Sequence, residues 1–397
     1  MSESEFYPSL APGFVLRRLE VPFIYDIPGD ELYELDDEAY EFIKKCDGKT
    51  PISKNILEAG EDAQEVIEYM QNEGIILMHE FAQPVEINGL QSPVPSLRYL
   101  LLNITNRCNL ACRHCYLGKA GHDEMEPGVF EKTVSQFEDM GGLKLMISGG
   151  EPLMHSKFRE LMDILSSYKL RTVLLSNGTL IDDITAKKLS AYVHEVQVSI
   201  DGTGSSHDLL RGNGSYEKAM KGIINLKNAG IPVSVATMVH RYNKGEFDGM
   251  QKIFSNMDVV SWGVDIPCEA GNLSGNREFI LDARDAAPFL EYGFGEAAHE
   301  STGNFTCGSH LCSVAVDGSV SRCGFFDEEP VGDAGDLGSA WDKLCKDYLW
   351  MLDRLDCADC CVINECRGGC RFRAKLYRGI LAPDPVMCHA KGVSGYL

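Results

Sequence analysis

Long apolar runs are absent from this sequence. No stretch approaches the roughly 20 consecutive apolar residues that a membrane-spanning helix needs, so we expect no membrane segment and no membrane partner. The first ten residues, MSESEFYPSL, lack the basic and apolar regions of a secretory signal. We therefore expect a cytoplasmic protein.

Basic residues are also scarce. The 397-residue chain has 37 Lys and Arg against 59 Asp and Glu, which gives a net charge of −22. Nucleic-acid binding requires Lys and Arg to neutralise phosphates, so this balance argues against a nucleic-acid partner. It fits a cationic partner or, more simply, a solvated acidic surface. The length implies two or three domains.

Cysteine is scarce in the first hundred residues, where only Cys46 occurs, although the whole chain has 15. Three lie within one short loop, and ten lie from Cys307 onward. In a long chain without a secretory signal, this pattern predicts metal binding or catalysis rather than disulfides. The distribution also divides the chain into three expected parts, at residues 1–90, 97–300 and 301–397.

The first part has the patterns of a small domain with strands and helices. Turn signals and periodicity predict strands at 13–20, 22–27 and 75–80, and helices at 37–46 and 61–74. Asp36 is expected to be the N-cap of the first helix. This order predicts a winged-helix-like module, followed by a proline-containing linker at 82–96. Positions 1–80 hold 19 acidic and 6 basic residues.

The second part alternates strands and helices. Six apolar, β-rich runs are expected to be strands, at residues 99–104, 144–148, 172–176, 193–200, 233–239 and 259–266. They predict an α/β fold with a parallel sheet, open or curled into a partial (β/α)6 TIM-type barrel. The active site of such a fold lies at the carboxyl ends of the strands. Four notable loops follow successive strands there: the three-cysteine loop, SGGEP (148–152), SNG (176–178) and Asp201-Gly202.

The three-cysteine loop has the pattern Cys-X3-Cys-X2-Cys, with Cys108, Cys112 and Cys115. An iron–sulfur cube normally takes four thiolates, so three leave one iron open. The loop directly after a first strand resembles the radical S-adenosylmethionine (SAM) superfamily. That resemblance implies a 4Fe-4S cluster whose open iron binds SAM, and reductive cleavage of SAM to a 5′-deoxyadenosyl radical. The alternative for three such cysteines is a structural zinc site or a chance cluster.

The same resemblance implies a set of SAM contacts. The expected residues are Gly149, Gly150 and Glu151 at the methionine end, Ser176 and Asn177 at the ribose, Ser199 and Arg211 at the carboxylate, and His114 at the aromatic position before the third cysteine. For Ser176, Asn177, Ser199 and Arg211, ordinary capping or turn roles are the alternative.

The third part resembles the SPASM extension of radical SAM enzymes, because its cysteine spacings and the glycine at 318 follow that pattern. The resemblance implies two auxiliary 4Fe-4S clusters, one held by Cys307, Cys312, Cys323 and Cys370, and one by Cys357, Cys360, Cys366 and Cys388. Four cysteines then stay unassigned: Cys46, Cys268, Cys345 and Cys361. A pair of zinc sites is the alternative, since Cys-X2-Cys occurs in both kinds of site.

The first part resembles the peptide-recognition element of maturases of ribosomally made peptides, related to the small chaperone of pyrroloquinoline quinone biosynthesis. The resemblance rests on element order and on the YDI…ELYELDDEAYEFI pattern. It implies binding of a precursor peptide by addition of a strand to a sheet edge, and the acidic surface predicts a leader with basic residues. A purely structural domain is the alternative.

We therefore expect a radical SAM/SPASM enzyme that forms a thioether or carbon–carbon crosslink in a peptide, with ferredoxin or flavodoxin as reductant. A tetrapyrrole-modifying enzyme of alternative heme synthesis is the second hypothesis. A non-catalytic electron carrier needs no open iron. Sulfatase-maturing enzymes carry an acidic base directly after an auxiliary cysteine, whereas Gly324 follows Cys323 here. Asp327 is then the nearest candidate base.

Overall fold

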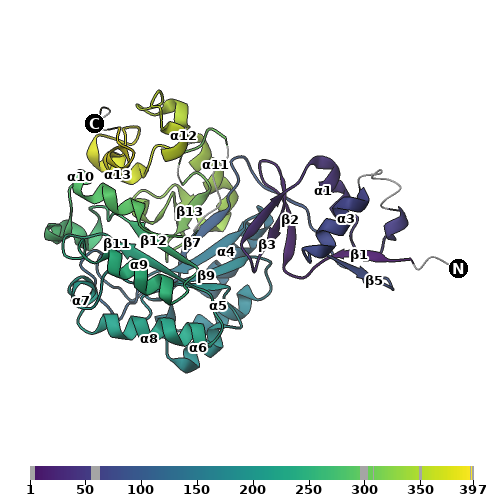
Figure 1. Ribbon diagram of the computed structural model, residues 1–397, viewed down its shortest axis with the longest axis horizontal. Coiled ribbons are helices and arrows are strands. Elements are labelled where there is room, and N and C mark those ends of the chain that lie inside the picture. Colours follow the sequence, from purple (N-terminus) through teal and green to yellow (C-terminus); the bar gives the residue numbers. More distant parts are fainter. Residues whose placement is uncertain are drawn as a thin grey trace. The chain divides into compact units, whose positions relative to one another are not determined.

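The computed structural model describes residues 5–54, 63–295, 303–306, 308–347, 351–393 and 395 (Figure 1). Cys307, an expected cluster ligand, lies outside the described residues. The chain divides into two compact units. Unit 1 is the described part of Met1–Arg98 together with Phe137–Leu143 and Tyr168–Arg171, and unit 2 is the remainder.

Unit 1 has two small sheets within its described residues. The first has the strand order β4 (Glu31–Glu34), β3 (Pro22–Asp26), β2 (Phe14–Arg18) and β6 (Leu90–Gln91). The second pairs β1 (Tyr7–Leu10) antiparallel with β5 (Ile76–His79). Helices α1 (Asp37–Ile43) and α3 (Ala63–Asn72) complete these elements.

The expected strands and helices of unit 1 are confirmed. Asp36 caps α1 as predicted, because its carboxylate accepts a hydrogen bond of 2.7 Å from the Ala39 amide. Strands β1 and β4 were not expected, and β6 lies inside the expected linker. That linker is anchored: the Ser96 amide donates to Glu20 at 2.7 Å.

The main sheet of unit 2 has the order β12-β11-β10-β9-β8-β7-β13-β14-β15 in the described part of the chain. The first six are parallel and confirm the predicted strands: β7 (Tyr99–Asn103), β8 (Lys144–Ser148), β9 (Arg171–Ser176), β10 (Glu195–Ser199), β11 (Val233–Met238) and β12 (Ser261–Asp265). The expected α/β barrel-type fold is therefore confirmed.

The cysteine-rich end of the chain extends this sheet. Strand β13 (Leu311–Val314) runs parallel to β7, and β14 (Ser319–Ser321) and β15 (Gly332–Asp333) follow it in antiparallel order. The third sequence region therefore shares a sheet with the second.

Helices follow the strands of unit 2. Between strands the order is α4 (Pro127–Asp139), α5 (Phe158–Leu165), α6 (Asp183–Leu189), α7 (Ser205–Arg211), α8 (Ser215–Asn228) and α9 (Phe247–Asn256) (Figure 1). After β12 come α10 (Ala283–Ala286), α11 (Leu337–Asp347), α12 (Ile363–Cys366), α13 (Arg371–Tyr377) and α14 (Pro385–Ala390). No helix among the described residues is long and apolar enough to cross a membrane.

Alternation along the strands separates the core from the site. On β10, Val196 and Val198 are fully buried, whereas Gln197 and Ser199 face a cavity. Successive strand residues point to opposite faces of a sheet, so one face packs on helices such as α8 and the other is free to line the cavity.

Candidate active site

A cavity of about 760 Å³ lies at the carboxyl ends of the parallel strands of unit 2. Its wall includes the last residues of five successive strands: Ser148, Ser176, Ser199, Met238 and Asp265. The three-cysteine loop and the segments around residues 323 and 370 complete the wall. The sequence-based expectation that the active site lies at this edge therefore matches the cavity's position.

The three-cysteine loop is held against other parts of unit 2 by backbone contacts. The Arg113 amide donates to Leu210 at 2.9 Å, and the Asn272 side-chain amide donates to the Cys112 carbonyl at 2.9 Å. Gly271 has a φ of 52°, and a Cβ there would lie 2.3 Å from the Cys115 carbonyl oxygen. The loop therefore has a defined course with its three cysteines on the cavity wall.

The donor set of this loop fits an iron–sulfur cluster. Cys108, Cys112 and Cys115 line one cavity, and burial raises the pKa of the Cys112 thiol to about 11. The sulfur of Cys108 already accepts a hydrogen bond of 3.5 Å from the Leu110 amide, a contact that favours a thiolate ligand. Among the described residues, no three His, Cys, Asp or Glu side chains converge around a single metal ion. A cubane differs because its thiolates bind separate irons.

Gly149 and Gly150 allow close contact with the three-cysteine loop. A Cβ on Gly149 would lie 2.3 Å from the Thr105 oxygen, and one on Gly150 would lie 2.3 Å from the Arg107 oxygen. Gly149 also has a φ of 131°, which favours glycine. The structure thus supplies a packing reason for both glycines, in addition to the expected approach to SAM, and both line the cavity.

Glu151 points away from the cavity and organises its neighbours. The carboxylate is fully buried, and it accepts hydrogen bonds from the Ser176 hydroxyl at 2.9 Å and the Asn177 amide at 2.9 Å. Ser176 and Asn177 line the cavity, whereas Glu151 does not. Burial raises the pKa of Glu151 to about 7, although its hydrogen bonds oppose the rise.

This carboxyl gives a pH-dependent contribution to stability. Because its pKa is raised on folding, the free energy of unfolding falls as pH rises from about 5 to 8. We expect Glu151→Gln to make this fall smaller, since glutamine does not ionise. Urea unfolding of the apoprotein across this pH range measures how the free energy of unfolding changes with pH. The exposed Glu160→Gln is the control. Equal slopes in wild type and Glu151→Gln would show that Glu151 does not titrate there.

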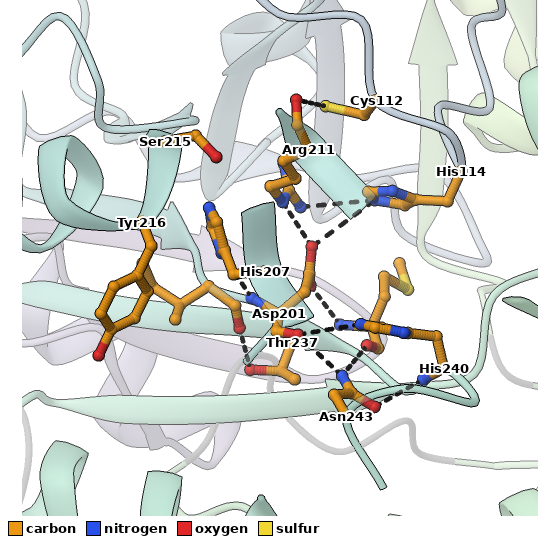
Figure 2. A network of polar contacts seen from close by, with 12 residues as sticks. Cys112, His114, Asp201, His207, Arg211, Ser215, Tyr216, Thr237, His240 and Asn243 are labelled. Carbon is orange, nitrogen blue, oxygen red and sulfur yellow. Dashed lines mark hydrogen bonds and ion pairs between the residues drawn. The ribbon is translucent and has the colours of Figure 1, made fainter. Parts of the chain in front are cut away.

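A buried ion pair includes Arg211, a residue of the cavity wall (Figure 2). Asp201 is fully buried; it forms an ion pair with Arg211 and accepts a hydrogen bond of 2.7 Å from the Met238 amide. Arg211 in turn lies 3.5 Å from the Nε2 atom of His114. Burial and the nearby Arg211 lower the pKa of His114 to about 4, so the imidazole stays neutral.

Sequence reasoning had placed Asp201 only as a loop residue after the fourth strand. Its carboxylate is the centre of the network in Figure 2, and Arg211 and His114, both expected SAM contacts, depend on it. An acidic residue directly after a strand, ten residues before an arginine, was the available signal. Ser199, the remaining expected SAM contact, also lines the cavity.

The structure gathers the cysteines expected to hold the second auxiliary cluster. Cys357, Cys360 and Cys388 are buried, and Cys366 is half-buried. Burial raises the pKa of Cys388 to about 11, and the charges of Cys357, Cys366 and Cys360 add to that rise. Four thiols that influence one another in this way form a donor set of the kind a cluster needs.

The other auxiliary set is only partly gathered in the described residues. Cys323 and Cys370 line the cavity. Cys312 lies on β13, is fully buried and is not on the cavity wall; the thiol that influences its pKa is that of Cys345. Cys268, which the sequence left unassigned, donates a hydrogen bond to Cys370 that lowers the pKa of Cys370.

Asp327, the candidate base, lies off the cavity wall. It accepts a hydrogen bond of 2.8 Å from Ser321, and burial raises its pKa to about 6. The cavity position next to Cys323 is instead taken by the ring of Tyr116.

Comparisons with known proteins agree with this site. Residues 102–252 match the Radical SAM superfamily. The AdoMet-dependent heme synthase of Oleidesulfovibrio alaskensis is 33% identical over 75% of this chain and 89% of its own length. The antilisterial bacteriocin subtilosin biosynthesis protein AlbA of Bacillus subtilis is 28% identical over 89% of this chain and 88% of its own.

A solved structure extends the similarity to the fold. Streptococcus suis SuiB, bound to the precursor peptide SuiA, superposes with a TM-score of 0.70 at 15% identity, over 95% of this chain and 98% of that chain. The family match, the relatives and the fold together show that the chain is an enzyme of the radical SAM superfamily, whose cofactors are a 4Fe-4S cluster and SAM.

Proposed function

We propose that this enzyme modifies a ribosomally synthesised peptide, forming a thioether or carbon–carbon crosslink after hydrogen abstraction. The proposal rests on the share of this chain that two of the matches cover. Residues 99–397 make up about three quarters of the chain. Matches that cover 89% and 95% of it must therefore extend into the first 98 residues. By their names, those two relatives act in bacteriocin biosynthesis and bind a precursor peptide.

The heme synthases support the second candidate, a tetrapyrrole substrate. The match to the Oleidesulfovibrio protein has the higher identity, 33%, but it covers 75% of this chain. That share does not require residues 1–98. The peptide hypothesis gives unit 1 a role, whereas the tetrapyrrole hypothesis does not.

The edge strand β4 of unit 1 supports the proposal that this unit binds a peptide. In the described residues, β4 has β3 on one side and no strand on the other. An added strand can pair with such an edge through its backbone groups. The exposed Glu31 and Glu34 lie at the two ends of β4. We therefore place a leader with basic residues beside β4.

Charge reversal on β4 tests this placement. We expect the double variant Glu31→Lys/Glu34→Lys to bind the precursor peptide encoded beside the gene about tenfold more weakly, because each exposed ion pair contributes at most ~1 kcal/mol. Fluorescence titration of the labelled peptide at low and high salt measures the loss. Glu160→Lys on α5 is the control with a similar change of charge. An unchanged affinity in the double variant would remove β4 as the binding edge.

Three of the arginines on the cavity wall are engaged by other groups of this chain. Arg211 is paired with Asp201, and Arg373 forms a 3.0 Å ion pair with Asp384. Arg371 donates to the Ala382 carbonyl at 3.0 Å. The carboxylates of a tetrapyrrole would have to share these arginines with the groups that already hold them.

The expected ligands then have defined tasks. Cys108, Cys112 and Cys115 would hold the SAM-binding cluster, and Arg211 and Ser199 would meet the SAM carboxylate. When bound, the cluster and SAM supply a 5′-deoxyadenosyl radical that removes hydrogen. Asp201 keeps Arg211 in place, and Glu151 keeps Ser176 and Asn177 in place.

We further propose two auxiliary 4Fe-4S clusters, which would accept the electron left on the substrate. Their ligands would be Cys307, Cys312, Cys323 and Cys370 for one, and Cys357, Cys360, Cys366 and Cys388 for the other. A ferredoxin or flavodoxin in the cytoplasm would be the reductant, since low-potential clusters and free thiols need a reducing compartment.

Mass spectrometry of the reaction products tests the proposed function. The anaerobically reconstituted enzyme is given SAM, a reductant and either the neighbouring precursor peptide or decarboxylated siroheme. We expect the peptide to lose two hydrogens only when SAM is cleaved. An unchanged peptide together with an altered tetrapyrrole would overturn the proposal and support the heme-synthesis alternative.

A further inference from the structure

Tyr116, Phe325, Phe326 and Phe372 all line the cavity. Three of them come one or two residues after a cysteine: Tyr116 after Cys115, Phe325 after Cys323, and Phe372 after Cys370. The ring centroids of Tyr116 and Phe325 are 5.3 Å apart, and those of Phe325 and Phe372 are also 5.3 Å apart. We call these three residues the aromatic wall. It lies between the three-cysteine loop and the cysteines at 323 and 370.

Neighbouring residues hold the aromatic wall in place. Phe326 is buried, and its ring meets that of Phe372 edge-on at 5.1 Å. A Cβ at Gly324 would lie 2.8 Å from the Tyr116 ring carbon Cε2 and 3.0 Å from the Tyr116 hydroxyl oxygen. Only glycine fits there without moving Tyr116. The position at which sulfatase-maturing enzymes are expected to carry an acid is thus filled by an aromatic ring.

The surface that the aromatic wall presents is apolar and uncharged. All three rings are half-buried, and Leu101, Leu117 and other apolar side chains share the cavity lining. The neighbouring arginines, 371 and 373, are already paired, as described above. Half-exposed rings gain most by covering an apolar partner.

We propose that the aromatic wall binds the side chain of the peptide residue that is modified, and that this side chain is bulky and apolar. The proposal rests on the proposed function and adds the class of substrate residue. A side chain at this place lies between the radical-generating loop and the cysteines at 323 and 370. The three rings themselves offer an acidic side chain no cationic partner, so they favour an apolar one.

The test uses full-length holoenzyme, reconstituted anaerobically and saturated with SAM. Equilibrium dialysis measures its affinity for four probes, the N-acetyl amides of phenylalanine, leucine, alanine and aspartate. We expect the phenylalanine and leucine probes to bind at least about tenfold more tightly than the other two. Iron content and SAM binding are measured on every variant, so that a folding defect is seen.

Variants connect the binding to the aromatic wall. Phe372→Ala and the milder Phe325→Leu are expected to weaken the phenylalanine probe, the first by about tenfold or more. Gly324→Ala should weaken it too, because the added methyl group displaces Tyr116. Tyr242→Ala removes a half-exposed ring outside the cavity and is the control.

The experiments distinguish failure of the aromatic wall as the side-chain pocket from failure of the proposed function. If the four probes bind equally while the wild-type enzyme modifies its peptide, the aromatic wall is not the side-chain pocket and the proposed function stands. If a porphyrin is altered, the peptide is not, and Phe372→Ala weakens porphyrin binding, the proposed function fails as well.

Discussion

Cys112→Ala is expected to abolish cleavage of SAM. Cys112 is one of three thiols on its loop, and the cluster that they are proposed to hold would have no spare protein ligand to replace it. The Asn272 side chain donates a hydrogen bond to the Cys112 carbonyl and so fixes the backbone there. Chromatography of 5′-deoxyadenosine under anaerobic, reducing conditions should give the enzyme-free background. Iron should fall by about four atoms per chain.

The matched control is Cys361→Ala. Cys361 is exposed and adjoins the expected ligand Cys360, so it shares the cysteine-rich context without a proposed ligand role. It should keep wild-type SAM cleavage and iron content. Wild-type cleavage by Cys112→Ala would refute the assignment of the three-cysteine loop, and loss of cleavage in Cys361→Ala would show that the effect is not specific.

Asp201→Asn is expected to reduce both stability and SAM binding. The variant leaves the Arg211 guanidinium buried without its counter-charge, and losing one partner of a buried pair costs about 3–5 kcal/mol. Freed from Asp201, Arg211 also loses its fixed position near His114. The Michaelis constant for SAM should rise, and the urea midpoint should fall. Asp163→Asn, at an exposed contact with Tyr192, is the control.

A double variant separates the loss of stability from the loss of SAM binding. Asp201→Leu/Arg211→Met replaces the ion pair by apolar side chains of similar size, which often restores the stability lost in a single variant. SAM cleavage should stay low, because the double variant lacks the arginine that is proposed to meet the SAM carboxylate. If the double variant recovered both stability and SAM cleavage, Arg211 would have no part in SAM binding.

Sequence patterns were sufficient for the parallel strands and for the edge where the cavity lies. Six apolar runs of strand length have strong periodicity, and connections between parallel strands bring their carboxyl ends to one edge. The short strand β1 (Tyr7–Leu10) was not predicted, because four residues show too little periodicity to indicate a strand. Strand β6 (Leu90–Gln91) escaped because a proline-containing segment around it indicates a linker.

Side-chain direction is what the sequence could not supply. Cysteine spacing indicates which residues share a kind of site, yet β13 alternation turns Cys312 away from the cavity while Leu311 faces it. Cys268, left unassigned, reaches Cys370 from a loop about a hundred positions earlier. Glu151 carries the family motif but turns inward to Ser176. Each depends on tertiary packing that no local pattern encodes.

The most direct test of the proposed peptide-modifying function measures the transfer of deuterium from the substrate to 5′-deoxyadenosine. The precursor peptide is prepared with deuterium on its carbon-bound positions, and 5′-deoxyadenosine from the reaction is analysed by mass spectrometry. If the enzyme is a radical SAM peptide maturase, the 5′-deoxyadenosine gains one deuterium as the peptide is modified. If it gains none from the peptide, but gains one when a deuterated tetrapyrrole is supplied instead, the account is contradicted.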